Sequence, residues 1–361
     1  MFLSAASHST FVLDGEAVLW GFGLNVDGQL GLGHREETPT PAIVPWPSER
    51  ASVLSVVAGS RHAVLLDADG AVWVAGNALY GRPPLLTFQA MEGLPSIKLV
   101  ACGHQHTMAL DESGKLWSFG TSNEHSQMGW TGSPVEAPRA IAKLPPIRLV
   151  ACGGQFTVAE AEDGGLWVSG RNNFGQLGLG DITGRIRPIR VPDFGLPDGP
   201  LLALAAGEAF SVLLDSQGRA WSCGNNEIGQ LGRTEGDTTL FHPIEGVTDL
   251  VSLAVGSSQV MAQDIDGQLW GWGYSCFEAS PISYDQRQTP NKSGSVGLWH
   301  TVAAGHDHSA FSDENGALVL RGRNRFGQLG NGVLGESRSD TKSSLTLAGV
   351  FRSKAKSARR E

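Results

Sequence analysis

The sequence has no long apolar run and few cysteines. No stretch approaches the roughly eighteen apolar residues of a membrane span, so we expect none. Residues 1–7 lack the basic start and long apolar segment of a secretory signal. The four cysteines show no CxxC spacing, which favours neither a zinc site nor a disulfide framework. We therefore expect free thiols in a reducing compartment, the cytoplasm or the nucleus.

Motifs that carry catalysis are also lacking. The sequence contains no Gly-x-Ser-x-Gly nucleophile motif and no glycine-rich phosphate loop. Glycine is nevertheless abundant, at 48 of 361 residues, without the three-residue period of collagen. We predict a protein that is not an enzyme and needs no cofactor, and we look for the reason for the glycines in an internal repeat.

The charge is unevenly distributed along the chain. The net charge is −9, and residues 352–361 contribute five basic side chains against Glu361 alone. The remaining body is therefore strongly acidic and a poor surface for phosphate backbones, so we expect no nucleic-acid partner. We expect residues 352–361 to be a disordered basic tail; an import signal or a nucleic-acid arm is the alternative.

The glycines follow a repeat of about fifty residues. Its clearest copy, residues 166–180, reads Leu-Trp-Val-Ser-Gly-Arg-Asn-Asn-Phe-Gly-Gln-Leu-Gly-Leu-Gly. A Gly follows the Trp position by three residues in seven copies. The Trp position is filled by Trp20, Trp73, Trp117, Trp167, Trp221, Trp270 and Val319. A fixed period of this length indicates a closed or stacked repeat array.

The upstream half of each unit repeats in phase. A Gly stands fourteen residues before the Trp position, as at Gly103, and a second column stands eleven before it. His62, His106 and His308 fill that second column, and Ser, Phe or Gln replaces them elsewhere. Each unit therefore reads as several short strands separated by tight turns.

We predict one all-β domain over residues 1–351, a seven-bladed β-propeller of four-stranded blades. Residues 1–6 match the middle of a unit, and Ser344–Phe351 resembles the lead-in strand Pro243–Thr248. A C-terminal strand at about 344–351 is therefore expected to complete the blade begun at 1–33, which would close the ring. The Trp column is predicted to be core between blades.

The units resemble the repeats of the regulator of chromosome condensation (RCC1) family. The resemblance rests on Gly-x-x-His-Thr, as at Gly103–Thr107, and on the motif at 166–178. It implies a seven-bladed propeller. The second, third and sixth repeats depart at Gly81–Pro84, Ser126–Gly129 and Cys276–Pro281, where we expect the blades to form with different loops.

Candidate recognition residues follow each upstream Gly, where the copies differ. In the family these positions lie at the mouth of the central channel. Variable polar residues there suit an asymmetric partner, although ordinary turn residues facing water are the alternative. The predicted partner-binding residues are Arg61, His104, Gln105, Gln155, Glu208, His306 and Asp307. Trp46, Trp130 and Trp299, in linking segments, are candidate exposed loop contacts.

A metal site is the alternative reading of two His-x-His pairs. His106 and His308 belong to the repeating column and are predicted to be structural. His104 and His306 are then left without evident co-ligands, so we predict no metal.

The favoured function is a non-catalytic protein–protein interaction scaffold, monomeric by itself, that uses one face of the propeller. The resemblance implies an alternative, guanine-nucleotide exchange on a small GTPase through mouth residues and a wedge inserted in one blade. The interval between the His and Trp columns is eleven residues in each of the six copies after the first. This constant spacing leaves no room for an inserted wedge there. Ultraviolet-B reception, which relatives perform with Trp just after the upstream Gly, is rejected because no Trp stands there.

Overall fold

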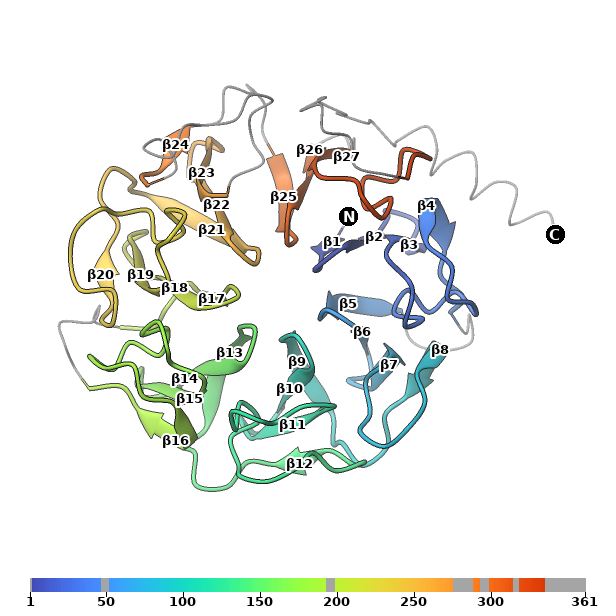
Figure 1. The fold of residues 1–361 in the computed structure, drawn as a ribbon, viewed down its shortest axis with the longest axis horizontal. Helices are drawn as coiled ribbons and strands as arrows, with labels where there is room; N and C mark the ends of the chain where they lie inside the picture. Colours follow the sequence, from blue (N-terminus) through green and yellow to red (C-terminus); the bar gives the residue numbers. More distant parts are fainter. Residues whose placement is uncertain are drawn as a thin grey trace.

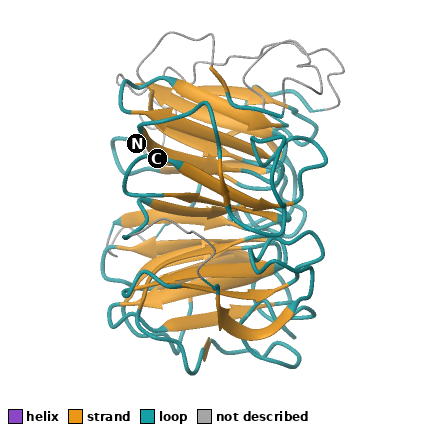
Figure 2. Cartoon of the chain, turned by 90° about the vertical axis from the view of Figure 1, so that its left-hand side faces the viewer, coloured by secondary structure: helices purple, strands orange, loops and turns teal. Residues whose placement is uncertain are grey.

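The computed structural model describes residues 2–46, 52–192, 199–274, 288–292, 299–313 and 318–334. They form seven antiparallel sheets arranged in a ring around a central channel (Figure 1). Seen from the side, the described elements are strands and loops (Figure 2). The predicted all-β seven-bladed propeller is confirmed. Within the described residues, no helix has the length and apolar character that crossing a bilayer requires.

The strands of each blade follow one another in chain order. The first three blades are β1 (Phe2–Ala5), β2 (Ser9–Leu13), β3 (Leu19–Gly23), β4 (Thr38–Ile43); β5 (Val53–Ala58), β6 (His62–Asp67), β7 (Val72–Gly76), β8 (Leu85–Ala90); and β9 (Ile97–Cys102), β10 (His106–Asp111), β11 (Leu116–Gly120), β12 (Arg139–Ala140). The next two are β13 (Ile147–Cys152), β14 (Phe156–Ala161), β15 (Leu166–Gly170), β16 (Arg185–Arg190); and β17 (Ala203–Ala206), β18 (Phe210–Leu214), β19 (Ala220–Gly224), β20 (His242–Pro243). The last two are β21 (Leu250–Val255), β22 (Gln259–Asp264), β23 (Leu269–Gly273), β24 (Asn291–Lys292); and β25 (Trp299–Ala304), β26 (His308–Asp313), β27 (Leu318–Gly322).

The innermost strand of each blade ends at the channel, and the fourth strand lies at the rim (Figure 1). The second, third and sixth blades form four-stranded sheets although their repeats depart from the motif. Their fourth strands vary in length, from six residues in β8 to two in β12 and β24, but β20 of the fifth blade, which keeps the motif, also has two. The departures therefore leave the inner strands intact.

The first blade differs in one respect from the sequence prediction. All four of its strands come from residues 2–43, because β4 pairs with β3 through Trp20 and Ile43. The strand expected to be lacking there is thus supplied locally. The seventh blade has three described strands, β25 to β27. Residues 344–351 lie outside the described residues, so closure by that segment stays a prediction.

Direct packing joins the seventh blade to the first. His308 Nε2 lies 2.8 Å from Thr10 Oγ1, and the main-chain N–H of His306 donates to the Ser7 carbonyl at 3.1 Å. Leu320 and Leu329 share one buried apolar cluster with residues of the first blade, Leu3, Val12, Trp20 and Phe22. The first and seventh blades thus share a common core.

The same hydrogen bond recurs between other neighbouring blades. His62 Nε2 lies 2.9 Å from Thr107 Oγ1, and His106 Nε2 lies 3.2 Å from Thr157 Oγ1. The Thr157 hydroxyl donates its one proton to the Gln127 carbonyl at 2.8 Å. It therefore accepts from the imidazole, which fixes the proton of the neutral ring on Nε2. The prediction that this His column is structural is confirmed.

Glycines at the hub allow the blades to approach closely. A Cβ on Gly103 would lie 2.4 Å from the Gly153 carbonyl oxygen and 2.2 Å from Cε1 of His106. Both distances are far inside contact, so any side chain there would push two blades apart. The upstream glycine column is therefore required by packing between blades.

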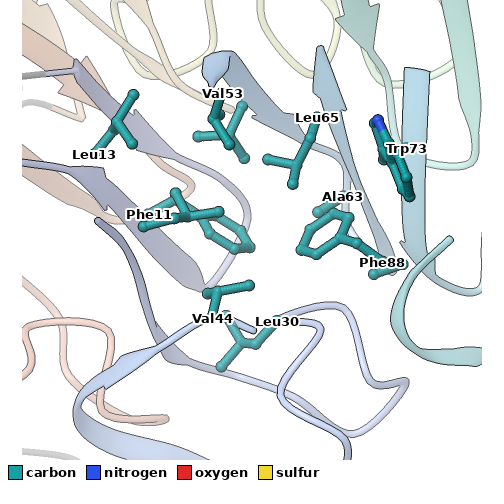
Figure 3. Packing of buried hydrophobic residues seen from close by; sticks show 12 residues of the cluster. Phe11, Leu13, Leu30, Val44, Val53, Ala63, Leu65, Trp73 and Phe88 are labelled. Carbon is teal, nitrogen blue, oxygen red and sulfur yellow. The ribbon is translucent and has the colours of Figure 1, made fainter. Parts of the chain in front are cut away.

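Apolar side chains fill the wedge between blades. Between the first two blades, Phe11, Leu30 and Val44 pack against Leu65 and Phe88 (Figure 3). Each fully buried side chain of this size contributes about 1.5–3 kcal/mol to folding.

The Trp column makes a hydrogen bond besides packing. An Asp six residues earlier accepts from the indole N–H in five blades: Asp14 from Trp20, Asp67 from Trp73, Asp111 from Trp117, Asp215 from Trp221 and Asp264 from Trp270, at 2.9–3.0 Å. The same carboxylates accept main-chain N–H groups of the intervening turn, as Asp215 does from Gln217 and Arg219. The fourth blade has Ala161 in this place, and Trp167 Nε1 is buried without a partner.

Replacing Ala161 with Asp is therefore expected to stabilise the protein by about 1–2 kcal/mol, since it gives the orphaned Trp167 N–H an acceptor. The matched change Asp215→Ala should destabilise it by at least about 2 kcal/mol, because Trp221 and two main-chain donors lose their partner. Urea unfolding of both variants measures these differences. An unchanged urea midpoint for Ala161→Asp would show that the missing acceptor does not lower the stability of the protein.

The buried His column predicts a pH dependence of stability. Burial lowers the pKa of His62 and His308 to about 4 and that of His106 to about 3. Between pH 6.5 and about 4 the unfolded chain therefore binds protons that the folded chain excludes. The free energy of unfolding should fall with decreasing pH by up to about 1.4 kcal/mol per pH unit for each His.

The variant His62→Gln/His106→Gln/His308→Gln removes these three titrations. Gln259 already fills this column in the sixth blade and donates to the His308 carbonyl at 2.9 Å, so the fold accepts the residue. The slope of unfolding free energy against pH, from urea titrations between pH 4 and 7, should be shallower in the triple variant. Identical slopes would contradict burial of neutral rings.

Candidate functional site

The residues after each upstream Gly form turns between the first and second strands of the blades, here called hub turns. Their first members line the central channel: Ser7, Ser60, His104, Gly154, Glu208, Ser257 and His306. Main-chain bonds run from turn to turn, with Ser60 N donating to His104 O and His104 N to Gly154 O, both at 3.2 Å. Glu208 N donates to Ser257 O at 2.9 Å. The hub turns are therefore held by one another.

The loops between third and fourth strands lie on the same face as the hub turns. Arg61 makes a two-pronged ion pair with Asp27 of the first blade's loop, with both nitrogen–oxygen distances 2.8 Å. Gln155 accepts from Arg171 at 2.8 Å. Gln105 contributes its main-chain carbonyl, which accepts from Thr121 N at 2.9 Å. Hub turns and these loops together make up what we call the mouth face.

A pair of side chains spans three blades at the channel mouth. His104 Nε2 of the third blade lies 2.5 Å from Glu208 Oε2 of the fifth. The fourth blade stands between them with Gly154, where a Cβ would lie 2.7 Å from the Glu208 main-chain oxygen and 3.2 Å from its carboxyl carbon. The absence of a side chain at residue 154 therefore lets Glu208 reach across to His104.

The charge on Glu208 is stabilised by its neighbours. Burial alone would raise the pKa of this carboxyl, but the hydrogen bond from His104 and the charges of His104, His306 and Arg171 lower it overall. The His104 and Glu208 side chains remain 37% and 44% exposed, so a partner can reach both. Solvent screening keeps the contribution of such a pair to stability small, about 0–1 kcal/mol.

His306 and Asp307 differ in exposure, although they are neighbours in one hub turn. The His306 ring lies edge-on to His8, with centroids 5.2 Å apart, and its pKa is lowered chiefly by burial. Asp307 is only 6% exposed and accepts from Gln328 Nε2 at 3.3 Å. Burial would raise the pKa of Asp307, but His8 and the two neighbouring histidines lower it. Asp307 is thus a buried support of the mouth face, whereas His306 borders the channel.

The three linking tryptophans have different environments. Trp130, predicted as an exposed contact, is 8% exposed and donates from Nε1 to Ser118 Oγ at 2.9 Å, with Arg139 over its ring. That prediction is wrong, because the ring fills the loop of the third blade. Trp46 is half-buried against Trp73, with ring centroids 4.9 Å apart. Trp299 begins β25, and its side chain lies outside the described residues.

The space within the channel is small. It holds about 100 Å³ of space, enough for a few waters at roughly 30 Å³ each and below the roughly 300 Å³ of small-molecule pockets. Across the described ranges, no group of three His, Cys, Asp or Glu side chains is placed to hold a metal ion. Cys102 and Cys152 border the channel, and burial raises the pKa of the Cys102 thiol to about 12.

The tips of the mouth-face loops carry exposed residues that were not among the predicted contacts. Tyr80 and Phe174 are exposed there, and Arg323 and Arg325 project from the seventh blade's loop. The sequence indicates them only through the residues that differ between copies of the Gly-x-Asn-x-x-Gly stretch. We had interpreted that stretch as part of the scaffold.

Repeats, hub and ring closure together define a seven-bladed propeller of RCC1-like units. A family model described as an RCC1-like domain matches residues 82–358, and RCC1 repeat models match residues 16–66 and 53–82. The chain belongs to the regulator of chromosome condensation (RCC1) family.

Two curated relatives illustrate the range of the family. The ultraviolet-B receptor UVR8 of Arabidopsis thaliana is 31% identical over 357 residues, covering 91% of this chain and 78% of the receptor. A secretion-regulating guanine nucleotide exchange factor of Mus musculus is 32% identical over 172 residues, covering 44% of this chain but only 36% of that protein.

Solved structures share the fold. Prp20p of Saccharomyces cerevisiae, studied for its binding to Gsp1p and histones, superposes with a TM-score of 0.77 at 21% identity, covering 99% of this chain and 85% of that one. Human WBSCR16 gives 0.75 at 22% identity, with 87% of each chain covered. At these identities the likeness shows the fold alone.

The bridge across Gly154 is testable by NMR. In Gly154→Ala the added methyl group should displace Glu208 from His104, and the pKa of Glu208 should rise toward that in His104→Ala. Carbonyl-detected titration of the Glu208 side chain measures both. The matched change Ser257→Ala, in the adjacent hub turn, should leave the Glu208 pKa where it is in the wild type. Equal Glu208 pKa values in the wild type and Gly154→Ala would contradict the bridge.

Proposed function

We propose that this protein is a non-catalytic protein–protein interaction scaffold that binds its partner with the mouth face. The observation that carries the proposal is the convergence of blade-specific polar side chains, His104, Glu208 and His306, at the mouth of a channel otherwise bordered by small residues. The likeness of the chain to family members with diverse roles supports a binding platform whose partner depends on variable residues.

A protein partner suits this site better than a small molecule does. The channel space is too small to bury a drug-sized ligand, whereas the mouth face offers polar and aromatic groups over several blades. The hub turns are tied to one another through main-chain bonds, so the face needs little ordering on binding. The scaffold is proposed to be a monomer in the cytoplasm or the nucleus, with no nucleic-acid partner.

Guanine-nucleotide exchange on a small GTPase is the second candidate. The partial likeness to the mouse exchange factor favours it. Against it, Asp307, the acidic mouth residue expected to take part, is buried beneath His8 and Gln328. Photoreception is not proposed, since the hub turns carry no Trp.

The decisive experiment compares two triple variants in quantitative pull-downs from the native source. His104→Ala/Glu208→Ala/His306→Ala alters the mouth. Asp69→Ala/Glu112→Ala/Asp266→Ala alters exposed turns between second and third strands, at the opposite ends of β6, β10 and β22. Partners that bind the wild type and the second variant but are lost from the first are the expected result.

Equal recovery by both variants would contradict binding through the mouth face. To separate the two candidate functions, the captured partner is incubated with fluorescent GDP. Nucleotide release that depends on this protein would favour exchange over a passive scaffold.

A further inference from the structure

Two blades carry nearly the same mouth-face loop. The fourth blade has Arg171-Asn-Asn-Phe174-Gly-Gln-Leu-Gly178, and the seventh has Arg323-Asn-Arg-Phe326-Gly-Gln-Leu-Gly330. The two stretches differ at one position, where Arg325 replaces Asn173. The fourth blade therefore serves as an internal reference for the seventh.

In the fourth blade the loop arginine is satisfied within the protein. Arg171 donates from Nε to Asn173 Oδ1 and from Nη1 to Gln155 Oε1, both at 2.8 Å. Its planar group is thus committed to neighbouring amides. Two of its five N–H donors are therefore engaged within the protein.

In the seventh blade, no carboxylate from the described part of the chain pairs with the corresponding loop arginines. Arg323 and Arg325 are exposed, and within the described residues neither forms an ion pair. The Cζ atom of Arg323 lies over the ring of Tyr274, 5.9 Å from its centroid, and Arg323 Nη2 donates to the Tyr274 hydroxyl at 3.3 Å. Arg325 lies over Phe326 at 5.2 Å. Each guanidinium thus lies within cation–π distance of an aromatic ring, and its remaining N–H groups are available for a carboxylate.

This arginine pair is continuous with the channel mouth. Phe326 packs against His8, with ring centroids 4.9 Å apart, and His8 packs against His306 at 5.2 Å. A partner seated on the mouth face would therefore meet Arg323 and Arg325 at its edge.

We propose that Arg323 and Arg325, with Tyr274 and Phe326, form a site for an acidic peptide segment of the partner protein. Aspartate or glutamate carboxylates would bind the guanidinium edges, and neighbouring apolar residues would pack on the aromatic rings. The site rests on the proposed function, since it extends the mouth face. A peptide is favoured over nucleic acid because two arginines match a few carboxylates, whereas a phosphate backbone is bound by a broader basic surface than this pair offers.

Fluorescence anisotropy with a labelled peptide of repeating Glu-Glu-Leu units tests the site. The wild type should bind this peptide more tightly than its Gln-Gln-Leu twin, and added salt should weaken binding. Arg325→Asn recreates the fourth-blade sequence, so it should fold, and it should weaken binding about tenfold or more. The charge-matched control Arg187→Asn, on exposed β16, should bind as the wild type does.

Undiminished binding by Arg325→Asn would overturn the proposal, as would equal affinity for the Gln-Gln-Leu peptide. Tighter binding of single-stranded oligothymidylate than of the acidic peptide would also overturn it. The pull-down separates this site from the proposed function. If Arg325→Asn retains every partner that the His104/Glu208/His306 variant loses, the acidic-peptide site fails while the mouth-face function stands.

Discussion

The structure depends on the close contact between neighbouring blades at the hub. A buried imidazole of one blade is hydrogen-bonded to a hydroxyl of the next, and a glycine beside it lets the two main chains approach. The seventh blade meets the first through the same bond, His308 to Thr10, as the second meets the third. A ring closed in this way has no exposed inner edge, and every blade is constrained by two neighbours.

The hub also explains how a repeating scaffold can carry a specific site. The glycine and histidine columns fix the turn, and the residues between them are free to differ. One such difference is the bridge from Glu208 over Gly154 to His104, which turns three separate blades into one polar surface. A second is Asp307, which is withdrawn from solvent and supports His8. Variable residues thus either contact a partner or position the residues that contact it.

The repeat pattern was sufficient to predict the seven blades and the structural role of His106 and His308, because both follow from columns in a period of about fifty residues. The bond between Asp215 and Trp221 was also within reach, since an Asp stands six residues before the Trp in most copies. The His104–Glu208 contact could not be predicted from the sequence, because it joins residues 104 positions apart across an intervening blade. Trp130 was misjudged because it lies in a linking segment, yet Ser118 and Arg139 enclose its ring.

The supply of all four strands of the first blade by residues 2–43 was likewise hidden from sequence. β4 has the sequence Thr-Pro-Thr-Pro-Ala-Ile, in which two prolines obscure the strand. They are tolerated because β4 is the outermost strand and pairs on one side only. The N-terminal blade is therefore complete, and among the described residues the first and seventh blades are joined by side-chain packing and by hydrogen bonds.

Hydrogen exchange of Leu320→Ala tests the closed ring most directly. Leu320 of β27 is fully buried in the cluster shared with β1, β2 and β3. If the ring is one cooperative unit closed by that packing, amides of β2 and β3 should lose protection together with those of β26 and β27. Faster exchange confined to the seventh blade, with the first blade as protected as in the wild type, would contradict this account.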